Sequence, residues 1–222
     1  MVIFRRLIYV SKLLTVLSAR DLSCEKQDRI LFENVDLQIE AGELVLLRGE
    51  NGAGKTSLLR ILVGLSQAQA GSVSICGEDV NHDINLASQH IIYFGHKLGV
   101  SGLLSPIENL TFWCKQHGLA ISHDNIVDTL ETLGLEGLES LPVKYLSQGQ
   151  QRRVSLARLW LKNDAKLWVL DEPMTALDVQ MVAQVEQKIT AFLRAGGSVL
   201  MTSHQAVKIE HEQREFTLEY RW

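Results

Sequence analysis

The sequence has few cysteines, no strong excess of one charge and no long apolar run. Its 222 residues carry a formal net charge of −4, which gives no support to a nucleic-acid partner. No stretch reaches about 18 consecutive apolar residues, so no segment is expected to span a membrane alone. The cysteines (Cys24, Cys76 and Cys114) lack metal-site spacing, and we interpret them as small buried residues in a reducing compartment.

The first 14 residues form an extension ahead of the predicted domain. Arg5 and Arg6 precede an apolar run, as in a secretory signal, but Ser11 interrupts that run. Apolar residues also recur there at helical spacing, which is typical of an amphipathic surface helix. Three interpretations remain: an irregular extension ahead of a strand near residues 15–22, a surface helix, or a cleaved signal.

Strand and helix patterns alternate at both ends of the chain and enclose a helical middle. Apolar patterns predict strands over 35–39, 42–47, 71–76, 166–173, 198–204 and 214–220, and helices over 55–64 and within 185–197. The middle, from about 99 to 161, is predicted to be helical, and a capping box from Ser105 to Glu108 starts one of its helices. This order predicts an α/β domain over 15–222, with a mainly parallel sheet and a helical subdomain at about 99–161.

A glycine-rich loop lies between a predicted buried strand and a predicted helix. Residues 49–57, GENGAGKTS, fit G-x-x-x-x-G-K-[ST] in the context that a phosphate-binding P-loop requires. Backbone N–H groups and the helix N-terminus would surround phosphate oxygens. Lys55 is expected to reach the β- and γ-phosphates, and Thr56 to offer a hydroxyl to Mg²⁺. The predicted nucleotide-binding residues are Gly49, Glu50, Asn51, Gly52, Ala53, Gly54, Lys55, Thr56 and Ser57.

Two carboxylates follow a second predicted buried strand. LWVLDEP (167–173) places Asp171 at the strand end, where it is predicted to hold Mg²⁺ directly or through water. We interpret Glu172 as the general base for the water that attacks the γ-phosphorus, a role that contributes roughly 10²- to 10⁴-fold in rate. His204 closes the next predicted strand. It is expected to hold Glu172 and the water in line, the alternative being an ordinary strand-end histidine.

The segment 146–158, LSQGQQRRVSLAR, predicts a helix with an unusual start. Ser147 is placed as the N-cap, and Gln150 completes a capping box. Gly149 lies in the first turn, where glycine costs about 1 kcal/mol relative to alanine. The bare backbone indicates that some group approaches this helix end closely.

These motifs together resemble the ATP-binding domain of ABC transporters. LSQGQ differs at one position from the family signature LSGGQ, and the P-loop, LDEP, the stretch 176–178 and His204 match as well. The resemblance covers the chain from about Leu17 onward. It implies a P-loop NTPase fold with a mainly parallel sheet, an antiparallel β region and a helical subdomain, and it implies ATP and Mg²⁺ as cofactors.

The resemblance also implies a dimer with a second copy of the chain. In the family, two domains sandwich two ATP molecules, and each site joins the P-loop of one copy to the signature of the other. A bare backbone at Gly149 would let the γ-phosphate approach the helix start. The signature-side residues expected to bind nucleotide are Ser147, Gly149, Gln150 and Asp178.

Two positions depart from the family pattern. His96 stands where members usually have a glutamine; a neutral imidazole nitrogen can contact Mg²⁺ or water, and the alternative is that His96 only packs. Members also often stack the adenine on an aromatic ring before the first core strands. Here Cys24 or Glu25 lies near that place and Phe32 is the only nearby ring, so no stacking residue is assigned.

Three longer stretches resemble the ATP-binding subunits of bacterial cytochrome c maturation (haem exporter) complexes. They are YFGHKLGVSGLLSPIENL, LSQGQQRRVSLARLWL and LWVLDEPMTALD. This resemblance implies transmembrane permease partners, a place on the cytoplasmic face of the inner membrane, and ATP hydrolysis coupled to release of haem-loaded chaperone or haem-related export. The alternatives are export of another cargo and a soluble ABC-type ATPase.

The chain itself is not expected to bind haem, because it has no C-x-x-C-H motif and no evident pair of haem ligands. The expected partner surface is a groove between the helical subdomain and the core, bordered by residues 98–104 and Trp113. The alternative is that Trp113 belongs to the core of the helical subdomain.

Overall fold

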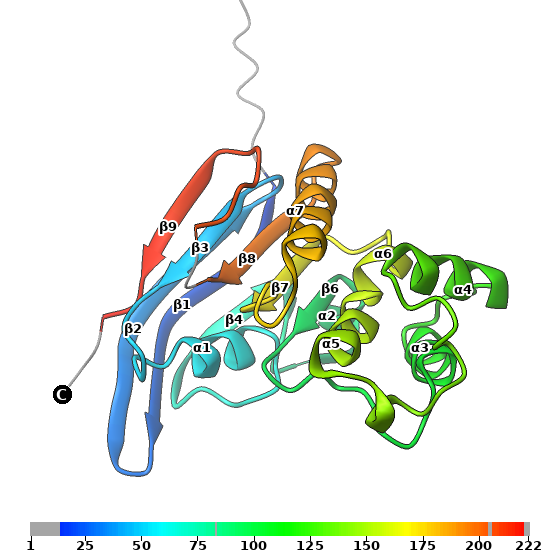
Figure 1. The fold of residues 1–222 in the computed structure, drawn as a ribbon. Coiled ribbons are helices and arrows are strands. Elements are labelled where there is room, and N and C mark those ends of the chain that lie inside the picture. The colour runs from blue at the N-terminus through cyan, green and yellow to red at the C-terminus, as the bar shows by residue number, and fades with distance from the viewer. Residues whose placement is uncertain (1–13, 83, 204–205, 220–222) are drawn as a thin grey trace, which may run out of the picture.

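The computed structural model describes residues 14–82, 84–203 and 206–219, and Figure 1 shows their arrangement in two sheets with helices. The four-stranded antiparallel sheet has the order β2-β1-β4-β5, and the five-stranded parallel sheet has the order β6-β7-β8-β3-β9. The strands are β1 (Thr15–Lys26), β2 (Arg29–Glu40), β3 (Leu44–Arg48), β4 (Ala70–Ile75), β5 (Glu78–Asp79), β6 (Ile91–Phe94), β7 (Leu167–Asp171), β8 (Ser198–Thr202) and β9 (Gln213–Thr217). The mainly parallel sheet and the antiparallel β region are confirmed.

The inner strands of the parallel sheet are continuous apolar runs, as expected for strands buried on both faces, whereas the edge strand β9 is mostly exposed. Every residue of β7 and of β8 is buried. Successive side chains enter two different cores, since strand residues alternate between faces. Leu44 and Leu46 of β3 join one core, while Val45 and Leu47 join the other.

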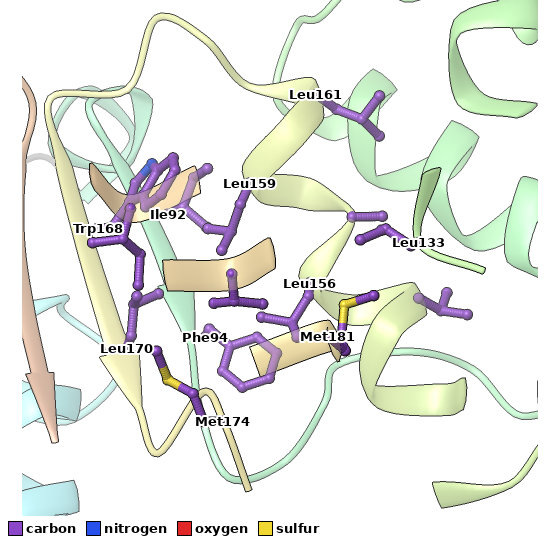
Figure 2. Packing of buried hydrophobic residues seen from close by; sticks show 14 of the residues in the cluster. Ile92, Phe94, Leu133, Leu156, Leu159, Leu161, Trp168, Leu170, Met174 and Met181 are labelled. Carbon is purple, nitrogen blue, oxygen red and sulfur yellow. The ribbon is translucent and has the colours of Figure 1, made fainter. Parts of the chain in front are cut away.

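Helices cover the two faces of this sheet separately. The leucines of α1 (Lys55–Leu62) pack in one core together with the antiparallel sheet. The other core contains residues of α5 (Gln148–Leu156), α6 (Arg158–Leu161) and α7 (Val179–Arg194). In Figure 2, Trp168 and Leu170 of the sheet face Leu156 and Leu159 of these helices. Trp168 also stacks on Phe192 of α7, with ring centroids 3.8 Å apart.

The predicted helical middle contains α3 (Pro106–Gln116), α4 (His123–Thr132), the 3-10 turn η1 (Val143–Tyr145), α5 and α6. The predicted capping box is present, since Ser105 N–H donates to Glu108 Oε2 at 2.7 Å and Glu108 N–H donates to Ser105 Oγ at 3.2 Å. A subdomain division at 99–161 within a domain over 15–222 remains a prediction. Most of the extension over 1–14 lies outside the described residues.

Some elements differ from the sequence predictions. The strand predicted at 35–39 is only the end of β2, which begins after a tight turn with positive φ at Gln27 and Asp28. Both β6 and the short helix α2 (Ile84–Gln89) were not predicted. A run of four residues is too short to show a period, and β6 is identified only by its pairing with β7.

Several smaller expectations can also be placed. All three cysteines are free; Cys24 and Cys114 are buried as expected, whereas Cys76 is partly exposed. Trp113 is half-buried and packs against the larger core, while Leu103 is 75% exposed. Within the part of the chain that the structure describes, no helix has the length and apolar character needed to cross a bilayer.

Leu156 provides a test of the core between α5 and the sheet. The side chain is fully buried. We expect Leu156→Ala to lower the free energy of unfolding by about 2–5 kcal/mol, because it removes buried methyl groups and leaves a cavity. Leu103→Ala, at an exposed site, should change it by about 0.5 kcal/mol or less. Urea denaturation measures both values, and equal losses in the two variants would contradict this account of the core.

Candidate functional site

The glycine-rich loop after β3 has the backbone of a phosphate cradle. Three of its residues have positive φ, namely Gly49 at 142°, Gly52 at 86° and Gly54 at 97°. Lys55 folds back over the loop, and its Nζ donates to the carbonyl oxygens of Gly49 at 2.7 Å and Glu50 at 2.9 Å. Among the described residues, no side chain caps the start of α1, so the first N–H groups of this helix remain available to an anion.

Two glycines of this loop, Gly49 and Gly54, also have a packing reason. A Cβ at Gly49 would lie 2.5 Å from the carbonyl oxygen of Leu218. A Cβ at Gly54 would lie 3.1 Å from Leu31 Cβ and 3.3 Å from the ring of Phe32. Phe32 is therefore buried beneath the loop, with 2% of its surface exposed, and its ring is not open for stacking on an adenine.

The carboxylate of Asp171, at the end of β7, joins the first turn of α1 to the end of β8. Thr56 Oγ1, at the start of α1, donates to Asp171 Oδ2 at 2.8 Å, and Thr202 Oγ1, at the end of β8, donates to Asp171 Oδ1 at 2.8 Å. Asp171 is 5% exposed. Because the carboxyl ends of parallel strands lie at one edge of the sheet, β3, β7 and β8 bring these groups together there. Thr56 and Asp171 offer two oxygen ligands of the kind Mg²⁺ prefers.

Glu172 follows Asp171 with an uncommon backbone conformation, a φ of +51°. Its N–H donates to Thr202 Oγ1 at 2.9 Å, and its carbonyl oxygen accepts a hydrogen bond from Arg152 Nη2. Its side-chain Oε2 accepts from Thr175 Oγ1 at 3.2 Å. The backbone of this residue is thus held on both sides.

The helix α5 begins as the sequence predicts. The Ser147 side chain accepts from the Gln150 N–H at 3.3 Å, and the Ser147 N–H donates to Gln150 Oε1 at 2.9 Å. The capping box is therefore confirmed. A Cβ at Gly149 would lie 3.1 Å from the carbonyl oxygen of Ala176 in the same chain, so the bare backbone also relieves a tight contact within the monomer.

Asp178 begins α7 and binds the second arginine of α5. Its Oδ1 accepts from the Met181 N–H at 2.9 Å, and Oδ2 accepts from the Arg153 guanidinium. The Met181 N–H, together with the Arg153 charge, holds the pKa of Asp178 below its usual value. This carboxylate therefore serves as a helix cap in the monomer.

The P-loop and the start of α5 lie apart within one chain. The helix α1 packs on one face of the parallel sheet and α5 on the other. Among the described residues, no hydrogen bond joins 49–57 to 146–150. Within one chain, α1 and α5 therefore belong to different layers of the fold.

Comparisons with known proteins agree with these features. A family model described as ABC transporter matches residues 32–175. The chain is 45% identical over 207 residues to the cytochrome c biogenesis ATP-binding export protein CcmA of Idiomarina loihiensis, covering 93% of this chain and 94% of the relative. It is 42% identical over 203 residues to the protein of the same name from Hahella chejuensis, covering 91% and 95%.

The chain belongs to the ABC transporter family. It is an ATPase of the ABC-transporter type, as the sequence motifs indicate. A solved putative ABC transporter ATP-binding protein from Pyrococcus furiosus has a TM-score of 0.74 at 28% identity, covering 91% of this chain and 96% of the other. A dimeric ATP-binding cassette bound to ADP and Pi has a TM-score of 0.80 at 23% identity, covering 93% and 97%, which supports the fold.

Two histidines of this ABC ATPase were predicted to take part in the site. His204 lies outside the described residues. His96 is exposed and follows the end of β6, so its role remains a prediction. The glycine before His96 is explained by its neighbour Tyr93, because a Cβ at Gly95 would lie 2.6 Å from the Tyr93 hydroxyl.

Tyr93 itself has a shifted pKa. Burial raises the pKa of Tyr93, and the charge of Asp171 adds to this effect.

Three residues near the candidate ATPase site were not predicted from the sequence. Thr202 could have been found, because it closes a buried strand in the same way as Asp171. Arg152 and Ala176 gave no such signal, since their contacts join segments 20 or more residues apart.

Thr202 offers a test of the Asp171 network. Thr202→Val removes the hydroxyl that serves both Asp171 Oδ1 and the Glu172 N–H. We expect it to lower the free energy of unfolding by roughly 1–3 kcal/mol and to reduce ATPase kcat, because buried polar groups lose their partner. Thr202→Ser keeps the hydroxyl and is the matched control. Both variants are measured by denaturation and by ATPase assay. Equal free energies of unfolding and equal kcat values in Thr202→Val and Thr202→Ser would contradict this network.

Proposed function

We propose that the chain hydrolyses ATP in a head-to-tail dimer with a second copy, as the ATP-binding subunit of a cytochrome c biogenesis export complex. The observation that carries the ATPase site is the bond from Thr56 to Asp171, which sets the P-loop hydroxyl against a strand-end carboxylate. This pair lies beside a glycine cradle and beside Glu172. A nucleotide phosphate tail and one divalent cation fit this combination of groups.

In the proposed site, the P-loop holds the phosphates of ATP. Backbone N–H groups from residues 49–57 surround them, and Lys55 turns from the carbonyl groups of its own loop to the β- and γ-phosphates. Thr56 and Asp171 would hold Mg²⁺, which supplies charge neutralisation when bound. Glu172 accepts the proton of the attacking water, and His204 is proposed to hold Glu172 and this water in line.

The proposed dimer follows from the separation of the two half-sites. The open N–H groups at the start of α5 favour an anion, and Ser147, Gly149 and Gln150 form that start. Since they lie on the other face of the sheet from α1, the P-loop of one chain needs the signature of a second chain. Asp178 lies beside the same helix and is proposed to reach the shared interface.

The biological setting is proposed from the relatives. Several CcmA proteins, among them one from Pseudomonas putida at 44% identity over 86% of this chain and 90% of the relative, are named for cytochrome c biogenesis and export. We propose transmembrane permease partners, a place on the cytoplasmic face of the inner membrane, and coupling of hydrolysis to release of haem-loaded chaperone or haem-related export. The surface near residues 98–104 is the proposed partner surface.

Mixing two inactive variants tests the shared site. Lys55→Ala removes charge-assisted bonds worth roughly 1.5–3 kcal/mol each, and Gly149→Asp puts a carboxylate where an anion should bind. Each variant alone should be inactive as a homodimer. In a mixed dimer, the intact P-loop of the Gly149→Asp chain meets the intact signature of the Lys55→Ala chain, so ATPase activity should return. Thermal melts of Gly149→Asp check that this chain still folds normally around Ala176. Purified mixed dimers that stay inactive although the Gly149→Asp chain melts like the wild type would rule out the shared site.

Complementation tests the biological setting. In a bacterium that lacks its own relative of this chain, the wild-type gene should restore covalent c-type cytochromes, measured by haem staining of gels. Glu172→Gln should be expressed equally but fail to restore them, because hydrolysis stops while ATP binding persists. Restoration by Glu172→Gln, or none by the wild type, would contradict the proposal. Affinity purification from membranes then identifies the hydrophobic subunits that accompany the chain.

A further inference from the structure

One face of α5 is fixed to the loop that follows β7. Gly149, Arg152 and Arg153 lie at helical spacing and all meet this loop, which runs over residues 172–178. A Cβ at Gly149 would lie 3.1 Å from the Ala176 carbonyl oxygen, and Arg153 binds Asp178. The signature helix and the catalytic loop of one chain are therefore attached at several points.

Arg152 makes the contact nearest to the proposed base. Its Nε donates to the Pro173 carbonyl oxygen at 3.3 Å, and its Nη2 donates to the Glu172 carbonyl oxygen. The guanidinium also lies over the ring of Phe94, with 4.8 Å from Cζ to the ring centroid. Arg152 is only 7% exposed, and burial lowers its pKa. A buried cation is costly unless it is bound in this way.

The conformation of Glu172 explains what this contact does. A positive φ at a residue other than glycine is uncommon and persists where the surroundings enforce it. Thr202 Oγ1 accepts from the Glu172 N–H, and Arg152 fixes the carbonyl on the other side. The two bonds hold the peptide groups on either side of Glu172, and through them the direction in which the Glu172 side chain leaves the backbone.

We propose that Arg152 is a positioning residue of the ATPase, which holds Glu172 of its own chain in the orientation for catalysis. The proposal rests on the proposed function of Glu172 as the base. Arg152 reaches no phosphate in this arrangement, since both of its acceptors are backbone carbonyls. Its loss affects the chemical step and leaves ATP binding by the P-loop intact.

Arg158 provides a matched control. It is also buried, at 9% exposed, donates to a backbone carbonyl, that of Gly99, and lies over a ring, that of Trp113. Arg152→Lys and Arg158→Lys each keep the charge and lose the planar fork of donors. Because misplacement of a reacting group by about 1 Å can cost 10²-fold, we expect Arg152→Lys to lower kcat by about tenfold or more.

The same variant should change KM for ATP by less than about threefold, since the P-loop is untouched. Arg158→Lys should keep kcat within about twofold of the wild type. Thermal melts of both variants measure any general loss of stability. An unchanged kcat in Arg152→Lys, a rise in KM alone, or an equal fall of kcat in both variants would overturn the proposal.

Mixed dimers separate positioning of the base from damage to the signature. The reference pairs a wild-type chain with a Lys55→Ala chain, which leaves one working site with the wild-type P-loop and Glu172. If Arg152→Lys is placed in the chain that supplies this P-loop, activity should fall about tenfold. If it is placed in the Lys55→Ala chain, which supplies only the signature, activity should equal the reference.

Equal activity in the two arrangements would overturn the role of Arg152 in its own chain. An inactive mixture of folded Lys55→Ala and Gly149→Asp chains would instead overturn the shared-site dimer, and the kcat and KM values of the homodimers would still decide whether Arg152 positions the base. The two proposals can therefore fail separately.

Discussion

The structure of the site depends on the buried carboxylate of Asp171. A carboxylate with 5% exposure must have partners, and it takes one hydroxyl on each oxygen, from Thr56 and from Thr202. These hydroxyls belong to the first turn of α1 and the end of β8, so one side chain fixes the P-loop helix, the carboxylate strand and the neighbouring strand at the same edge. Thr202 then extends the network to the Glu172 N–H. The geometry around a bound phosphate tail is therefore fixed before any nucleotide arrives.

The strand order makes this network possible. The sheet order β6-β7-β8-β3 places the strand that carries Asp171 between the strand that leads to His96 and the strand that ends at Thr202. Only a fully parallel sheet aligns all of these carboxyl ends, and it must be covered on both faces. That covering separates α1 from α5. The same topology that assembles the phosphate and metal groups at one edge thus places the signature helix on the opposite face.

Local patterns predicted most of the fold and much of the site. The P-loop, the carboxylate pair and the capping boxes at Ser105 and Ser147 are defined within a few residues, and their geometry is set by turns and helix starts. The contacts of Arg152 and Ala176 could not be predicted, because they arise only when α5 packs on the loop after β7. The short strand β6 was not predicted for a related reason, since only its pairing with β7 defines these four residues as a strand. The sequence showed that Phe32 is the ring near the expected adenine position, but it could not predict that this ring is buried under Gly54.

Gly149 is explained both by the local sequence pattern and by tertiary packing. Its cost of about 1 kcal/mol in a first turn indicates a close approach, and the monomer already contains one in the Ala176 carbonyl oxygen. The glycine lets α5 lie against the loop that begins at Glu172, and Arg152 then reaches the Glu172 carbonyl one helical turn later. In the proposed dimer the same bare backbone receives the phosphate of the partner's ATP. In this proposal, close packing on one side of Gly149 positions the base of one site, and open N–H groups on the other side complete the second site.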